Sequence, residues 1–222
     1  MCNEACIEFG RAILQEEEIR GKSVIEVGSM DVNGSLRPTV EAYGPKRYIG
    51  VDFQMGPGVD LVCDANDLLD RFGRDSFDVL ISTELLEHVR DWRKVIGNFK
   101  NLLKSNGTIL VTTRSKGCAF HGYPFDFWRY ETTDLQSIFS DFVIECIAKD
   151  PTLPGVFLKA TKPYPFSEKK LDDHELYSII RDKRVRTISD GDVSWFKAKY
   201  AIRRLPWKAI KPIKTFLKKK IG

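Results

Sequence analysis

The amino-acid sequence predicts an α/β fold built on a mostly parallel sheet that ends in an antiparallel hairpin. Apolar, β-rich runs alternate with stretches of helical periodicity over the first two thirds of the chain, as expected for parallel strands joined by helices. Two later β-rich runs, 142–148 and 156–161, are joined by a short segment with Pro151, Pro154 and Gly155. This segment is too short for a parallel crossover, so it predicts a hairpin.

The first strand is expected to end at Glu26, and a loop with Gly28 and Gly34 leads from it into a helix over 35–43. Glycine lacks a Cβ, so the loop can turn tightly and approach a ligand. We expect free backbone N–H groups at the helix start to hold an anionic group of that ligand. The carboxylate of Glu26 favours a cationic ligand group nearby over a nucleotide phosphate. An ordinary βα turn is the alternative.

Four further strands are expected, each followed by polar residues. The second ends at Asp52, about 20 residues after the glycine loop, where βαβ folds place a carboxylate on ribose hydroxyls. The third ends at Asp64 and Ala65. The fourth, 77–83, leads into the sequence ELLEHV, and the fifth spans 107–113. The polar residues should therefore gather at the carboxyl edge of the sheet, where open α/β sheets bind ligands.

The remaining helices are expected where apolar residues recur at helical spacing. These segments are 3–19, 66–72, 91–103 and 132–139. Thr132 or Thr133 is expected to cap the last of them.

The composition is that of an ordinary globular protein, with 42% hydrophobic and 30% charged residues among 222. No secretory signal is visible at the N-terminus, and no uncharged run approaches the ~20 residues of a membrane helix. Five scattered cysteines predict a reducing cytosol and not a disulfide framework. Cys2 and Cys6 have the spacing of half a zinc site but lack a second pair, so no metal is expected.

The charge is distributed unevenly along the chain. We expect one domain over 1–162, with an N-terminal helix in 1–20, and a C-terminal extension over 163–222. The last part of the extension, 195–222, holds ten Lys/Arg residues and no acid. An apolar stripe over 207–221 makes this tail typical of a helix on an anionic membrane surface. A helix docked on the body and a solvated tail are the alternatives.

The motifs EVGSMDVNG, YIGVD, Asp64-Ala65, FDVLISTELLEHV and LLKSNGTILVTT together resemble a class I S-adenosylmethionine (SAM) methyltransferase in order and spacing. The resemblance covers roughly residues 20–162 and extends to the type-11-like group found near sugar and polysaccharide biosynthesis genes. One departure is Met30, which replaces the middle glycine of the family's D/E-x-G-x-G-x-G loop. The resemblance implies a Rossmann-like three-layer sandwich with a seven-stranded sheet, SAM as cofactor and S-adenosylhomocysteine (SAH) as product.

The resemblance also implies a set of cofactor-binding residues. Asp52 would bind the ribose, and Asp64 would receive the adenine amino group, although Asp64 could instead cap the following helix. Glu26 would face the methionine end, and backbone carbonyls at the end of the fourth strand would meet the ammonium. The full set is Glu26, Gly28, Ser29, Gly34, Asp52, Phe53, Asp64, Ala65, Ser82 and Thr83.

Two places are candidates for catalytic residues. The segment 118–130 follows the fifth strand and joins several aromatic residues to His121, Asp126 and Arg129. His121 has the intrinsic pKa of a general base for a hydroxyl acceptor. The alternative is a structural core in which Asp126 pairs with Arg129. His88 occupies the place of a widespread family histidine, and it could pack or cap a helix instead.

These features predict a cytoplasmic enzyme, peripheral at a membrane if the tail binds one. The expected reaction is O-methylation of a small molecule or of a glycan or lipid-linked sugar. An RNA methyltransferase is one alternative, although the mildly acidic body argues against nucleic acid. A non-catalytic SAM-binding scaffold is another. An NAD-dependent dehydrogenase is disfavoured, because the first loop lacks G-x-G-x-x-G.

Overall fold

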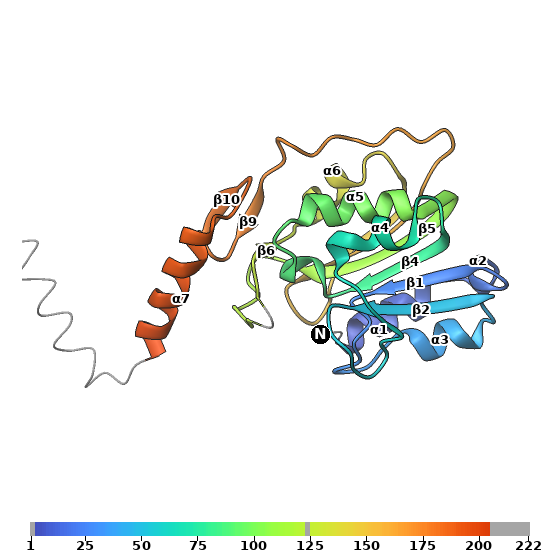
Figure 1. Ribbon diagram of the computed structural model, residues 1–222, viewed down its shortest axis with the longest axis horizontal. Helices are drawn as coiled ribbons and strands as arrows, with labels where there is room; N and C mark the ends of the chain where they lie inside the picture. Colours follow the sequence, from blue (N-terminus) through green and yellow to red (C-terminus); the bar gives the residue numbers. More distant parts are fainter. Residues whose placement is uncertain (1–2, 123–124, 205–222) are drawn as a thin grey trace, which may run out of the picture.

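The computed structural model describes residues 3–122 and 125–204 (Figure 1). Its main sheet has seven strands in the order β3-β2-β1-β4-β5-β8-β7. The strands are β1 (Ser23–Val27), β2 (Arg47–Asp52), β3 (Leu61–Val62), β4 (Phe77–Thr83), β5 (Leu103–Arg114), β7 (Val143–Lys149) and β8 (Gly155–Thr161). β8 is antiparallel to both β5 and β7, while the other pairs are parallel. The mostly parallel sheet with its antiparallel hairpin is confirmed.

Helices cover both faces of this sheet, which gives the expected three layers (Figure 1). One face carries α4 (Leu68–Phe72), α5 (Trp92–Leu102) and α6 (Thr132–Ile138). The other carries α1 (Glu4–Ile13), α2 (Glu16–Ile19) and α3 (Arg37–Ala42). Each face has its own apolar core: the helix α5 packs Trp92, Val95 and Phe99 into the larger one. Leu14, Ile19 and Leu36 belong to the smaller one.

Three local expectations needed correction. The N-terminal segment forms two helices, because Gln15 starts the second one with a capping box that involves Glu18. The N-cap of α6 is Glu131, whose box partner is Asp134, and not Thr132 or Thr133. The third strand is only two residues long, although a further backbone bond from Cys63 N–H to Asp52 O continues its pairing.

The C-terminal extension contributes a second sheet and a long helix. β6 (Trp128–Arg129) pairs with β9 (Leu176–Ser178), which pairs with β10 (Lys183–Val185), all antiparallel. Side chains of the extension, including Leu176, Ile180 and Ile188, are buried in the larger core. α7 (Asp190–Arg204) follows and projects from the body (Figure 1).

Within the described part of the chain, no helix is long and apolar enough to cross a membrane. The apolar stripe expected over 207–221 lies outside the described residues, so its role at an anionic surface stays a prediction. Among the described residues, Cys63, Cys118 and Cys146 are free thiols.

Candidate functional site

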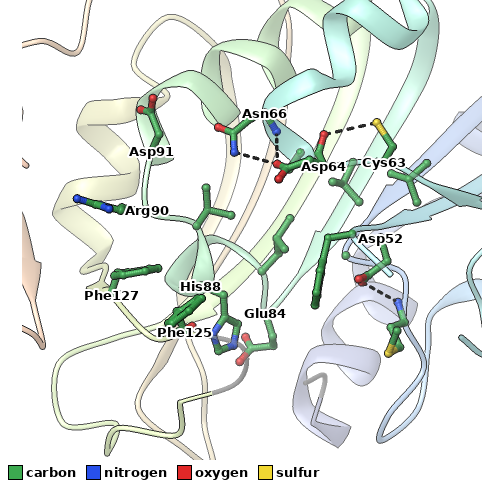
Figure 2. A pocket seen from close by; sticks show the side chains of 18 of the residues that line it. Asp52, Cys63, Asp64, Asn66, Glu84, His88, Arg90, Asp91, Phe125 and Phe127 are labelled. Carbon is green, nitrogen blue, oxygen red and sulfur yellow. Dashed lines mark hydrogen bonds between the residues drawn. The ribbon is translucent and has the colours of Figure 1, made fainter. Parts of the chain in front are cut away.

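A cavity of about 980 Å³ opens at the carboxyl ends of β1, β2 and β4. Its two ends differ (Figure 2). Asp52 and Asp64 lie at one end, and His88, Arg90 and Phe125 lie at the other. The polar residues that follow successive strands thus meet around one space, as the sequence predicted.

Two buried carboxylates occupy the ends of the first two strands. Glu26 receives a hydrogen bond from the Tyr48 hydroxyl, yet burial raises its pKa to about 7. Asp52 accepts long hydrogen bonds of 3.4 Å from the N–H groups of Met30 and Gln54, and burial raises its pKa also. Both acids are thus desolvated without a cation in contact among the described residues. A cationic or hydroxyl-rich ligand in the cavity would stabilise both.

The third acid, Asp64, begins the 3₁₀ turn η1 (Ala65–Asp67). Its Oδ1 accepts hydrogen bonds of 2.8 Å from both the backbone N–H and the side-chain amide of Asn66. The capping role is therefore real. Asp64 and Ala65 nevertheless line the cavity, and the described chain gives Oδ2 of Asp64 no hydrogen bond, so a ligand can use that oxygen.

Phe53 supplies an aromatic face beside Asp52. It lines the cavity and is 46% exposed. An exposed ring next to a carboxylate suits a ligand that combines a flat heterocycle with hydroxyl groups.

The glycine loop lines the cavity, and three of its N–H groups already have acceptors within the chain. The N–H groups of Gly28 and Ser29 both donate to Val51 O, and that of Gly34 donates to Asp31 Oδ1. Gly28 has φ +80°, and a Cβ there would lie 3.0 Å from the Leu85 Cβ. Glycine is thus required at position 28 for close packing, and the expectation of ligand binding by N–H groups at the helix start stays a prediction.

The chemistry of the wall fits a polar ligand. Ser29 Oγ and Asn66 Oδ1 are buried and have no hydrogen-bond partner among the described residues, and both residues line the cavity. Buried polar atoms without a partner are rare in proteins, so two such atoms in residues of one cavity wall favour a polar ligand there. Thr83 also lines the cavity. Ser82 does not, although its Oγ is buried and similarly unsatisfied.

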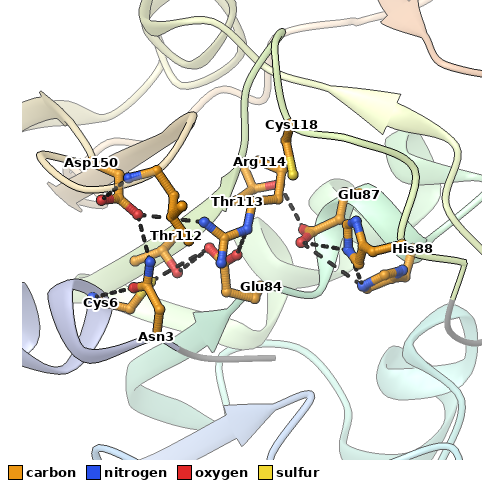
Figure 3. Close-up of polar contacts among 12 residues, drawn as sticks. Asn3, Cys6, Glu84, Glu87, His88, Thr112, Thr113, Arg114, Cys118 and Asp150 are labelled. Atoms are coloured by element: carbon orange, nitrogen blue, oxygen red, sulfur yellow. Dashed lines mark hydrogen bonds and ion pairs between the residues drawn. The ribbon is translucent and has the colours of Figure 1, made fainter. Parts of the chain in front are cut away.

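Glu84 follows β4 in a strained conformation, with φ 55°. Its carboxylate contacts Arg114 and accepts a hydrogen bond of 3.0 Å from Thr112 Oγ1 (Figure 3). Arg114 also pairs with Asp150 at 3.4 Å. This buried network holds the cavity wall at the end of β4, and a non-glycine residue with positive φ is common at functional sites.

The four candidate catalytic residues fall into two groups. His88 lines the cavity, and His121 contacts it, with 3.2 Å between the two Nε2 atoms. Asp126 and Arg129 do not line the cavity, and each is only 1% exposed. Their ion pair uses two hydrogen bonds, of 2.5 Å and 2.7 Å. This geometry favours the structural alternative for that pair.

The sequence pattern did not indicate the residues that close the cavity at the His88 end. Arg90 donates to Ile188 O at 2.9 Å and 2.6 Å, and Arg93 donates to the carbonyls of Leu171 and Arg186 at 2.7 Å and 2.6 Å. These arginines hold the extension against the cavity. The lining that it supplies is Arg186, Thr187, Ile188, Asp190, Val193, Ser194 and Lys197. The two arginines shortly after ELLEHV, Arg90 and Arg93, were the only sequence feature that pointed to these contacts.

Solved structures resemble this chain in fold. One is the Burkholderia thailandensis 1,6-didemethyltoxoflavin-N1-methyltransferase with bound 1,6-didemethyltoxoflavin and SAH. It has 15% identity and a TM-score of 0.58, over 72% of this chain and 80% of that one. Another is a SAM-dependent methyltransferase from Mesorhizobium loti, with 18% identity and a TM-score of 0.53, over 72% and 99%.

A third is the Haemonchus contortus phosphoethanolamine N-methyltransferase 2 in complex with SAM. It has 16% identity and a TM-score of 0.55, over 72% of this chain and 52% of that one. No curated protein matches the sequence. A family model described as a methyltransferase domain matches residues 3–148, most of the chain. With the seven-stranded sheet and the acid-lined cavity at its carboxyl edge, this match shows that the chain belongs to the methyltransferase domain family, on the class I SAM-dependent fold.

Proposed function

We propose that this protein transfers a methyl group from SAM to an oxygen atom of a small molecule or of a glycan or lipid-linked sugar. The observation that carries the proposal is the convergence of Glu26, Asp52 and Asp64 in one cavity. SAM supplies a methyl group on a positively charged sulfur, and it also carries an ammonium, two ribose hydroxyls and an adenine. These are the groups that three carboxylates at successive strand ends can bind.

Each acid has a role that follows from its surroundings. Asp52 accepts hydrogen bonds from the ribose hydroxyls, since its own bonds to backbone N–H groups are long. Asp64 receives the adenine amino group on Oδ2, while Oδ1 keeps its cap. Phe53 stacks on the adenine. Glu26 faces the ammonium of the methionine part, which offsets the desolvation of its carboxylate.

The acceptor binds at the end lined by His88, Phe125 and Phe127. Phe125, 43% exposed and stacked on the buried Phe127 at 5.8 Å, offers an apolar surface to the C–H groups of a sugar ring or to a flat acceptor. Arg186 and Lys197 add positive charge from the extension, which suits an acceptor with a phosphate or carboxylate group. Positioning supplies much of the rate when the electrophile is already activated.

Isothermal calorimetry with purified protein tests cofactor use. We expect SAM and SAH to bind with micromolar or tighter affinity and NAD to show no heat of binding. Binding of NAD without SAM would contradict the proposal. Binding of SAH without turnover of any hydroxyl acceptor would favour the SAM-binding scaffold instead.

The affinity for SAH is expected to rise about tenfold between pH 6 and pH 8, because only the ionised form of Glu26 attracts the ammonium. With a pKa of about 7, Glu26 is mostly protonated at the lower pH and mostly ionised at the higher one. Calorimetry of the wild-type chain and of Glu26→Gln over this range measures the effect. Glu26→Gln should bind SAH more weakly than the wild-type chain at high pH, and its affinity should depend much less on pH. An unchanged pH dependence in Glu26→Gln would mean that the ligand or another group of the protein titrates in this range.

A further inference from the structure

Three side chains from two distant segments converge beside the acceptor end of the cavity. Glu87 and His88 lie in the 3₁₀ turn η2 (Leu86–His88) after β4, and His121 lies in the loop after β5. The two histidine Nε2 atoms are 3.2 Å apart. Glu87 Oε1 is 3.9 Å from the His88 Nε2 and 4.0 Å from the His121 Nε2. Figure 3 shows the Glu87 carboxylate turned toward His88.

The Nδ1 atom of each histidine ring already has a hydrogen-bond acceptor. His88 Nδ1 lies within hydrogen-bond distance of Phe125 O, and His121 Nδ1 is 3.0 Å from Asp126 Oδ2. A carbonyl and a carboxylate only accept, so each Nδ1 carries the hydrogen and donates it. In the neutral ring this leaves a lone pair on each Nε2, and the two Nε2 atoms are 3.2 Å apart. Metal-binding histidines are oriented in the same way, by a carbonyl or carboxylate that accepts from the ring nitrogen that does not bind the metal.

Two nitrogen lone pairs at 3.2 Å repel, so a proton or a cation between the two Nε2 atoms would stabilise this arrangement. A proton is the competitor of a cation here. A proton between the rings does not satisfy Glu87, however. Its side chain is fully buried, and Oε1 has no hydrogen-bond partner in the described part of the molecule.

We propose that Glu87, His88 and His121 form a binding site for a divalent transition-metal ion of the zinc type. Nitrogens bound to one tetrahedral ion at about 2.1 Å lie about 3.4 Å apart, close to the 3.2 Å between these rings. The Glu87 carboxylate needs to approach by less than about 1 Å to join them. Thr113 Oγ1 donates to Glu87 Oε2 at 2.9 Å and holds the carboxylate in this orientation.

The donor set indicates the kind of ion and its setting. Two imidazoles and one carboxylate suit zinc, iron or nickel, whereas magnesium and calcium prefer oxygen ligands alone. Three protein ligands leave one position open for a further ligand, as in catalytic zinc sites. Because His88 also lines the cavity, this open position lies next to the acceptor end. An oxygen atom of the acceptor can complete the coordination.

This site was not expected from the sequence, where only Cys2 and Cys6 had metal-like spacing. His121 follows Glu87 and His88 at a distance that matches no common metal motif. The loop that holds His121 brings it back to η2, and the buried Asp126–Arg129 pair fixes that loop, since Arg129 donates to the carbonyls of Cys118 and Ala119 at 3.2 Å and 3.1 Å.

Metal titration of the full chain, without an affinity tag and after treatment with a chelator, tests the site. Calorimetry with Zn²⁺ alone should give one equivalent with a Kd below about 1 µM, and Mg²⁺ should not compete. Co²⁺ should give the weak visible bands of nitrogen and oxygen ligands. An intense near-ultraviolet band from thiolate ligation would put the metal on cysteines and overturn the site, and so would the absence of binding at 100 µM Zn²⁺.

Substitutions then assign the ligands. Glu87→Gln and His121→Ala should each weaken Zn²⁺ binding by roughly 100-fold or more, because each removes a direct ligand. The matched control is His174→Ala, at the remaining histidine of the chain, which pairs with Asp134 at 3.2 Å outside the cluster. It should bind Zn²⁺ like the wild-type chain. Folded variants of Glu87 and His121 with unchanged binding would overturn the proposal. If the variants fail to fold, the Co²⁺ spectrum of the wild-type chain tests the ligand set instead.

Discussion

Replacing Arg129 with alanine is expected to lower the free energy of unfolding by about 3–5 kcal/mol, because it removes the guanidinium that pairs with the buried carboxylate of Asp126. Arg129 donates to both oxygens of Asp126 and to three backbone carbonyls. The hydrogen bonds from Arg129 and His121 to the carboxylate hold the pKa of Asp126 well below its usual value despite burial. The carboxylate would then have to take up a proton or draw in water.

Urea unfolding followed by circular dichroism measures this change. Arg20→Ala is the matched control, since Arg20 forms an exposed pair with Glu16 and should contribute less than about 1 kcal/mol. The double variant Asp126→Leu/Arg129→Met should recover much of the loss, because it removes both buried charges together. A stable Arg129→Ala protein without turnover would instead support a catalytic role for Arg129.

Replacing Asp52 with alanine is expected to weaken SAH binding by roughly 1.5–3 kcal/mol, or about 10- to 150-fold, the contribution of hydrogen bonds to a charged group. The carboxylate lies at the end of β2 in the cavity wall, and its long bonds to backbone N–H groups leave it free to accept from ligand hydroxyls. Fold stability should change little, since burial without a cation already disfavours the ionised form.

Calorimetry with SAH on folded variants measures this loss. Asp52→Asn should give an intermediate affinity, because the amide keeps one acceptor oxygen but no charge. Asp70→Ala is the control, since Asp70 is exposed on α4 and does not line the cavity. Equal affinity of Asp52→Ala and the wild-type chain would remove Asp52 from the cofactor site.

The fold and the gathering of acids in one cavity were predictable from the sequence because both depend on local patterns. An apolar run followed by Glu26 or Asp52 already indicates a strand with a polar end, and parallel strands bring such ends to one edge. The capping function of Asp64 also follows from its position before a turn. These features need no knowledge of which distant segments meet.

The acceptor end was not predictable in the same way. The approach of His121 to Glu87 depends on how a loop packs, and hydrophobic periodicity carries no information about that. The same holds for the contacts from Arg90 and Arg93 to the extension. The acceptors of the Gly28 and Ser29 N–H groups could not be predicted either, because Val51 O lies on the neighbouring strand.

The attachment of the extension has a consequence for how this protein could acquire new specificities. The acceptors of Arg93 are backbone carbonyls, those of Leu171, His174 and Arg186, and Arg90 uses Ile188 O besides its ion pair with Asp190. Apart from that ion pair, these bonds do not depend on the side chains of the segment that they hold. The exposed lining residues Arg186, Thr187, Ser194 and Lys197 can therefore diverge while the backbone contacts stay unchanged. Grafting this segment from a relative would be a modular route to a new substrate.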